Sequence, residues 1–82
     1  MTTRAKTEIT ATWQQVSAGP AFLYLHGYRN VYIAVGTSVP AIDDDAYITL
    51  TRADRTLNWN GTDNVYARTD PGVVENLVVW AP

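Results

Sequence analysis

The close spacing of turn-forming residues constrains this chain more than any other feature of its sequence. Glycine, proline, asparagine or aspartate separates about seven short runs of β-type residues, at intervals of roughly 8 to 12 residues. No segment shows the sustained 3.6-residue period of a helix. Such a pattern is typical of an all-β sandwich or barrel. The expected strands are 8–17, 22–25, 31–35, 47–52, 56–59, 65–68 and 73–80.

We therefore expect a small antiparallel β-sandwich or barrel of about seven short strands, preceded by an extended N-terminal arm. Residues 1–7 would form the arm, because they are mostly polar and carry no large apolar group before Glu8. Residues 8–82 would form a single domain. Asn60-Gly61 predicts a type I′ turn, in which both central residues have positive φ, and this turn would join 56–59 to 65–68 as a hairpin.

The size of the chain limits its core. A domain of 82 residues buries only about 60% of the surface that its unfolded chain exposes, and such domains often gain stability from disulfides, metals or partners. This chain has no cysteine and a single histidine, His26, so the usual disulfide and zinc sites are excluded. We therefore expect extra stability from burial against another subunit or in a larger assembly.

Charge and hydropathy exclude two classes of partner. The net charge of −2 and a pI near 5.0 argue against a nucleic-acid partner, which would require clustered Lys and Arg. No window approaches the roughly 20 apolar residues of a membrane span, and the N-terminal residues lack the apolar core of a signal peptide. We expect no membrane partner and synthesis in the cytoplasm.

The residues that could carry chemistry are few. His26 could act as a general base, but the chain has no G-x-S-x-G motif, and a strand-end position facing solvent is the simpler interpretation. Asp43-Asp44-Asp45 could offer oxygens to Ca²⁺, although the spacing of an EF-hand is missing and a solvated loop is favoured. We expect no enzyme, no metal and no cofactor.

The aromatic and apolar residues allow two interpretations. The runs 31–35 and 77–80 are apolar at every position, which predicts strands covered on both faces and makes Tyr32 and Trp80 candidates for an outward contact surface. The size of the indole instead favours Trp13 and Trp80 as core residues. Trp59, between two asparagines and beside a glycine turn, is expected to be exposed or at a contact.

Four segments carry a resemblance to a known class of protein. They are Trp13-Gln14-Gln15-Val16-Ser17-Ala18-Gly19, Val31-Tyr32-Ile33-Ala34-Val35-Gly36 with Pro40, Val65-Tyr66-Ala67-Arg68, and Val78-Val79-Trp80. In this order they resemble small proteins that decorate or cement the capsids of tailed bacteriophages. The resemblance implies a non-enzymatic β module on the capsid surface of the virion, with the major capsid protein or another virion protein as its partner. It also implies a homo-oligomer, as a trimer or dimer.

On this interpretation the chain would bind an assembled capsid and stabilise it. The arm would meet acidic groups of the shell, and exposed aromatic residues would supply the remaining contacts. The candidate interface residues are Arg4, Lys6, Tyr28, Arg29, Tyr32 and Trp59. The alternative is a glycan- or receptor-binding module of a phage tail or fibre, with Trp59 and nearby tyrosines as a stacking platform. A bacterial β-sandwich with an unrelated interaction function also stays open.

Overall fold

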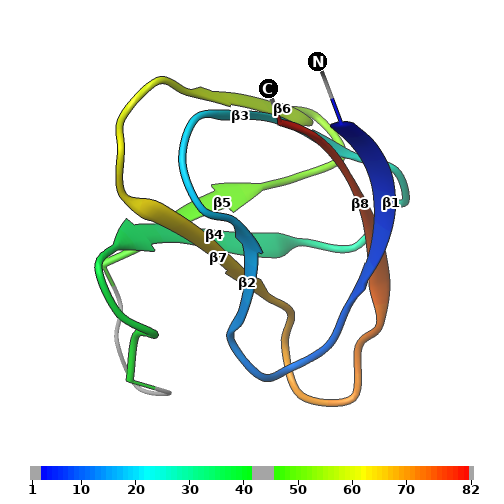
Figure 1. Cartoon of the computed structure of the whole chain (residues 1–82). Coiled ribbons are helices and arrows are strands. Elements are labelled where there is room, and N and C mark those ends of the chain that lie inside the picture. Colours follow the sequence, from blue (N-terminus) through cyan, green and yellow to red (C-terminus); the bar gives the residue numbers. More distant parts are fainter. Residues whose placement is uncertain (1–2, 42–45, 82) are drawn as a thin grey trace.

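The computed structural model describes residues 3–41 and 46–81, and this part of the chain is all-β. It contains eight strands in two antiparallel sheets of four, packed as a small sandwich (Figure 1). The predicted fold class is therefore confirmed. The strands are β1 (Thr3–Ile9), β2 (Gln14–Ser17), β3 (Ala21–Leu25), β4 (Val31–Gly36), β5 (Ile48–Leu50), β6 (Thr56–Trp59), β7 (Asn64–Arg68) and β8 (Glu75–Ala81).

Consecutive strands mostly lie in opposite sheets. The first sheet has the order β1-β8-β3-β6 and the second has the order β2-β7-β4-β5, so only β4 and β5 are neighbours both in sequence and in a sheet. The pairing is thus almost entirely long-range, which makes the register of each strand dependent on tertiary packing.

Among the described residues there is no helix long and apolar enough to cross a membrane.

The expected N-terminal arm is wrong for residues 3–7, because these residues belong to the sandwich. They form most of β1, which pairs with β8 without interruption from Thr3 opposite Ala81 to Ile9 opposite Glu75. The single expected strand 8–17 is also wrong, since the chain leaves the first sheet after Ile9 and enters the second at Gln14. The polar composition of residues 1–7 predicts an arm, but an edge strand with one solvent-exposed face also contains many polar residues.

The predicted hairpin at Asn60-Gly61 is wrong as well. β6 pairs with β3 in the first sheet, whereas β7 pairs with β2 and β4 in the second. Gly72 is the one described residue with positive φ, so Asn60 does not adopt the conformation of a type I′ turn. Gly61 is required for a different reason, because a Cβ at this position would overlap the ring of Trp59.

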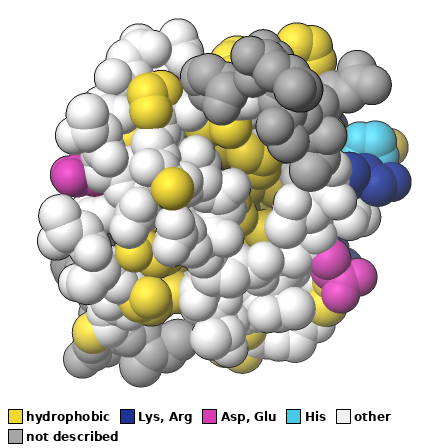
Figure 2. Space-filling model, in the orientation of Figure 1, with side chains coloured by type: hydrophobic (Ala, Val, Ile, Leu, Met, Phe, Trp, Pro, Cys, Tyr) yellow, Lys and Arg dark blue, Asp and Glu magenta, His cyan; other side chains and the backbone are white. Residues whose placement is uncertain are grey.

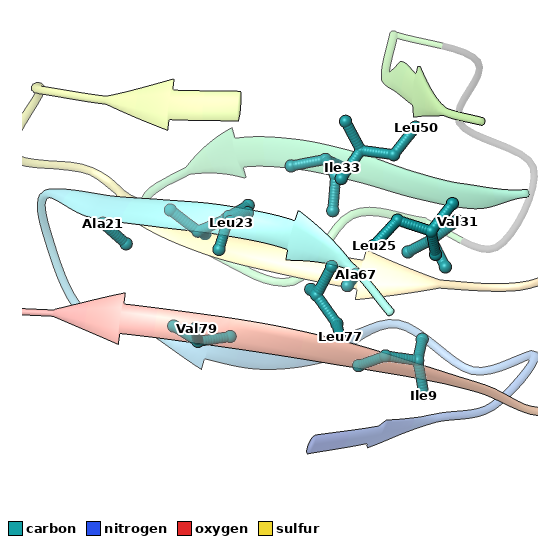
Figure 3. Close-up of a cluster of buried hydrophobic side chains, with 11 residues drawn as sticks. Ile9, Ala21, Leu23, Leu25, Val31, Ile33, Leu50, Ala67, Leu77 and Val79 are labelled. Carbon is teal, nitrogen blue, oxygen red and sulfur yellow. The ribbon is translucent and has the colours of Figure 1, made fainter. Parts of the chain in front are cut away.

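The core lies between the two sheets and is built from their inward positions. Side chains from both sheets point toward one another there, including Leu23 and Leu77 from the first sheet and Ile33 and Leu50 from the second (Figure 3). Strand alternation explains the selection, since the odd-numbered residues of β3 are buried and the even-numbered ones are exposed. In the orientation of Figure 1, hydrophobic side chains are visible in a central hollow, and charged groups lie toward the margins (Figure 2).

Candidate functional site

The outer face of the first sheet carries a block of apolar side chains that the core does not use. Phe22 and Tyr24 point outward from β3, and Val78 and Trp80 point outward from the neighbouring β8. The register places Phe22 opposite Trp80 and Tyr24 opposite Val78, so the four residues form two adjacent cross-strand pairs. We call these four residues the aromatic face. Its three aromatic side chains remain 39–45% exposed.

Polar positions border the aromatic face on both sides. On the β1 side, Lys6 is exposed opposite Val78, and the backbone of Arg4 lies opposite Trp80. On the β6 side, Asn58 lies opposite Phe22 and Thr56 opposite Tyr24. The sheet therefore changes across its width from basic positions to an apolar centre to neutral polar groups. This arrangement resembles a protein interface, where aromatic residues form the centre and polar groups the rim.

One end of the aromatic face is hollowed. The hollow has a volume of about 240 Å³. Its lining combines two exposed aromatic rings with two exposed asparagines and carries no charged side chain. The lining residues are Pro20, Ala21, Phe22, Asn58, Trp59, Asn60 and Trp80. It is smaller than the range of roughly 300 to 1,000 Å³ for drug-sized ligands, so it matches a single small ring.

The outer face of the second sheet is also rich in aromatic residues, but the chain covers it with its own side chains. Trp13 is 5% exposed there, and its indole N–H donates to the Ala41 carbonyl at 3.1 Å. Tyr47 packs on Trp13 with 6.1 Å between ring centroids, and it packs on Tyr32 at 4.7 Å. Trp13 is thus buried as predicted, although on the outside of a sheet rather than in the inter-sheet core.

The guanidinium of Arg68 lies among these rings. Its central carbon is 5.1 Å from the ring centroid of Trp13, 4.9 Å from that of Tyr32 and 5.6 Å from that of Tyr47. One terminal nitrogen donates to the Thr69 carbonyl at 3.2 Å, while the Nε atom is buried without a hydrogen-bond partner. Cation–π contact is the main compensation for burying this charge. The cluster therefore acts as a small second core.

The hydroxyl of Tyr32 donates to Asp70 Oδ1 at 2.6 Å at the rim of the same cluster. This hydrogen bond, followed by burial, raises the pKa of the Tyr32 hydroxyl above its ordinary value. Asp70 begins the turn 70–73, in which Val73 N–H donates to the Asp70 carbonyl and Gly72 has a φ of 81°. Proline before such a glycine is the signature of a type II turn.

A buried carboxylate holds the loop after β3. Glu75 is 8% exposed, and its Oε2 accepts hydrogen bonds from Tyr28 N–H and Arg29 N–H, each at 3.0 Å, while Oε1 accepts one from Asn76 N–H at 2.8 Å. Burial by itself raises the pKa of Glu75, but these donors and nearby His26 outweigh it, so the pKa lies below its ordinary value. Gly27 leaves room for the carboxylate, which a Cβ there would overlap.

The structure places the predicted interface residues in different regions. Arg4 and Lys6 belong to β1 beside the aromatic face, and Tyr28 and Arg29 lie exposed in the loop that Glu75 holds. Tyr32 belongs to the Arg68 cluster. Trp59 is half-buried against the core, with its indole N–H donating to the Asp63 carbonyl at 3.1 Å, so it is not an exposed platform.

Two assignments of Trp80 were open, and the outward one is confirmed. Trp80 is 45% exposed, so its expected place in the core is wrong. The sequence analysis missed Phe22, Tyr24 and Val78 as members of the same face. The uninterrupted apolar run 21–25 could have indicated them, because it carries the same signature as 31–35 and 77–80.

The described part of the chain contains no group of three or more His, Cys, Asp or Glu side chains that could hold a metal ion. Asp43, Asp44 and Asp45 lie outside the described residues. His26 is exposed directly after β3, and its backbone N–H donates to the Asn76 carbonyl at 3.0 Å. Comparisons with protein families, curated proteins and solved structures found no match to this chain.

Proposed function

We propose that this chain is a non-enzymatic structural protein of a phage virion that binds an assembled capsid through the aromatic face and stabilises it. The observation that carries the proposal is the aromatic face itself. Its four apolar side chains are adjacent in register on a rigid sheet, and the three aromatic rings remain substantially exposed. Rigid aromatic side chains provide large contact areas at a low cost in conformational entropy.

The border of the face indicates the chemistry of the partner surface. Lys6 and the backbone of Arg4 lie on one side of the apolar centre, so a complementary surface would present an apolar centre with acidic groups at one rim. The whole chain has a net charge of −2, which makes this basic border a local feature rather than a general one. Opposite charges at a rim contribute mainly to orientation and association rate.

Stabilisation of the shell would follow from mass action. A protein that binds the assembled shell, and not its dissociated subunits, shifts the equilibrium toward the shell, and the shift grows with the ratio of its concentration to the Kd. A single small face gives a weak contact, but a capsid lattice repeats the binding site many times. Oligomers of this chain could then engage several sites at once and gain avidity.

The direct test is co-sedimentation of the purified protein with capsids of the virus that encodes it. The wild-type chain should sediment with the shells and raise their melting temperature in calorimetry. The double variant Phe22→Ser, Trp80→Ala should stay in the supernatant. Val39→Ser is the matched control, because Val39 is 59% exposed outside the aromatic face. Equal binding by the double variant and the wild type would contradict the proposal.

The hollow beside the aromatic face favours a second candidate, a glycan- or receptor-binding module of a tail or fibre. Phe22 and Trp80 could stack on the apolar side of a sugar ring, while Asn58 and Asn60 could bond its hydroxyl groups. Tryptophan fluorescence titrated with host surface polysaccharide separates the two candidates. A spectral shift that Asn58→Ala abolishes would favour the glycan module, and an unchanged spectrum would favour the capsid protein.

A further inference from the structure

β1 differs from the other three edge strands of the sandwich. β2 has an irregular register between Gln15 and Ser17, β5 contains three residues, and β6 contains four. β1 contains seven residues, pairs with β8 in one continuous register and has neither proline nor glycine. Edge strands in monomeric proteins are usually short, bulged or interrupted, because a long regular edge can accept another strand. The β1 edge lacks these three protections, and charged side chains such as Lys6 are the protection that it retains.

The charges of β1 select how a second copy could pair with it. Lys6 and Glu8 are exposed on the outer side of the sheet, and Arg4 precedes Lys6 by two positions in the same strand. Parallel pairing in register would place like charges side by side. Antiparallel pairing centred on Lys6 would oppose the two lysines at its centre, although it also brings position 4 opposite Glu8. Pairing centred on residue 5 would oppose positions 4 and 6, which are both basic. Pairing centred on Thr7 opposes Lys6 and Glu8 twice, which is favourable.

We propose that β1 binds the β1 strand of a second copy of this chain, antiparallel and centred on Thr7. Lys6 of each copy then faces Glu8 of the other. The two four-stranded sheets become one continuous sheet, and the two-fold axis perpendicular to it keeps both aromatic faces on the same side. The dimer rests on β1 alone and does not require the proposed capsid function, although it would double the aromatic surface available to any partner. In the dimer, Lys6 at the border of the aromatic face would pair with Glu8 of the second copy.

Gln14 limits this pairing. Its side-chain Nε2 donates to the Glu8 carbonyl at 3.1 Å, so the amide occupies the β1 edge near the proposed centre. A second copy must displace this amide before its main chain can approach Glu8. Removing the amide should therefore favour the dimer. Gln14→Ala is expected to tighten self-association, and a weaker dimer in this variant would overturn the proposal.

The central test is sedimentation velocity of the wild type and of charge variants, in low salt and without capsids. The wild type should form a dimer as its concentration rises to roughly 1 mM, and Lys6→Glu and Glu8→Lys should each raise the dimer Kd about tenfold. A mixture of the two single variants, and the double variant Lys6→Glu, Glu8→Lys, should regain wild-type association. Arg52→Glu changes the net charge as Lys6→Glu does and should have little effect.

Recovery of dimerisation in the double variant Lys6→Glu, Glu8→Lys distinguishes the register centred on Thr7 from the other registers. If the strands were centred on Lys6, residue 8 would face Arg4, and the double variant would oppose two cations and stay weak. A wild type that remains monomeric at all concentrations would overturn the proposal, as would single variants that dimerise normally. Circular dichroism and urea unfolding of each variant establish that the fold is retained. Capsid co-sedimentation is measured separately, so failure of the proposed function would leave this result unaffected.

Discussion

β4 and β8 carry the same sequence signature but have different outer faces. Both strands contain continuous apolar runs, Val31–Val35 and Leu77–Trp80. On β4 the outward residues Tyr32 and Ala34 lie under other parts of the chain, and Ala34 is buried. On β8 the outward residues Val78 and Trp80 lie between the neighbouring strands β1 and β3, and Trp80 is 45% exposed.

The difference shows what a continuous apolar strand can and cannot indicate. Such a run predicts that both faces are covered, but it does not say whether the chain or a partner provides the cover. For β4 the cover is internal, since Trp13, Tyr47 and Arg68 close over the sheet. On the β8 side, Trp80 and the neighbouring rings of Phe22 and Tyr24 stay 39–45% exposed among the described residues. This contrast is the physical basis for placing the docking surface on the aromatic face.

The largest expected effect comes from removing the internal cover. Trp13→Ala would lose a nearly buried indole, its hydrogen bond to Ala41 and its contact with Arg68. We expect a loss of about 3–5 kcal/mol in unfolding free energy, a large part of the stability of a small domain. Trp80→Ala, the same substitution on the open face, should cost about 1 kcal/mol.

Urea unfolding of both variants measures this difference. If Trp13→Ala leaves too little folded protein to fit, Trp13→Phe provides the comparison, because it keeps a ring in the cluster while removing the N–H donor. Equal losses for Trp13→Ala and Trp80→Ala would mean that the two faces contribute alike to stability. The contrast between an internal cover and an open docking face would then be wrong.

The second-largest effect on stability is expected for Glu75, which accepts hydrogen bonds from the loop after β3 that contains Tyr28 and Arg29. Glu75→Gln would replace an acceptor of three N–H groups by an amide and should cost about 1–3 kcal/mol near neutral pH. The pKa of Glu75 is lowered on folding, so its contribution is present above the unfolded value of about 4.3 and is lost as pH falls through the folded pKa.

Unfolding free energies of the wild type and Glu75→Gln, measured between about pH 7 and about pH 2, check this dependence. The difference between them should be largest near neutral pH and should shrink below about pH 4.3. Asp63→Asn serves as the control, because the hydrogen bond from the Trp59 indole N–H goes to the backbone carbonyl of residue 63, which the substitution keeps. A difference that stays constant with pH would show that Glu75 contributes through packing rather than through its charge.

A smaller effect is expected for Arg68 in the covered face. Arg68→Lys keeps the charge but loses the flat guanidinium that lies among the rings of Trp13, Tyr32 and Tyr47. We expect a loss of about 1 kcal/mol, because a lysine ammonium stacks less well than a guanidinium. Arg52→Lys, on an exposed loop, is the matched control and should be neutral. Urea unfolding that finds both substitutions neutral would mean that the rings alone form the cover.

The sequence predicts the fold class because that depends on local signals. Turn residues and the absence of helical periodicity indicate short strands, and the described structure contains them. Strand pairing is not local here. Asn60-Gly61 has the composition of a hairpin turn, yet β6 and β7 join different sheets, and β1 has the composition of an arm although it pairs with β8. These outcomes depend on which long-range pairs bury the most apolar surface.

The aromatic face could be predicted only in part for the same reason. The sequence identifies Trp80 as a possible outward residue, but Phe22 lies far from it along the chain, and only the β3-β8 register makes them neighbours. Conversely, Tyr32 has the same sequence signature and lies against Arg68 in the covered cluster. Exposure depends on what packs over a strand, and neither local composition nor alternation contains that information.

The smallest effect on stability is expected for the aromatic face itself, and this makes it the sharpest test of the comparison. Phe22→Thr and Tyr24→Thr replace half-exposed rings by a residue that suits a strand, so each should change the unfolding free energy by no more than about 0.5 kcal/mol. Capsid co-sedimentation of the same variants should fall strongly, since the rings are the proposed contact. A loss of stability with unchanged binding would make these rings part of the fold, as Trp13 is, and would move the docking surface away from β3 and β8.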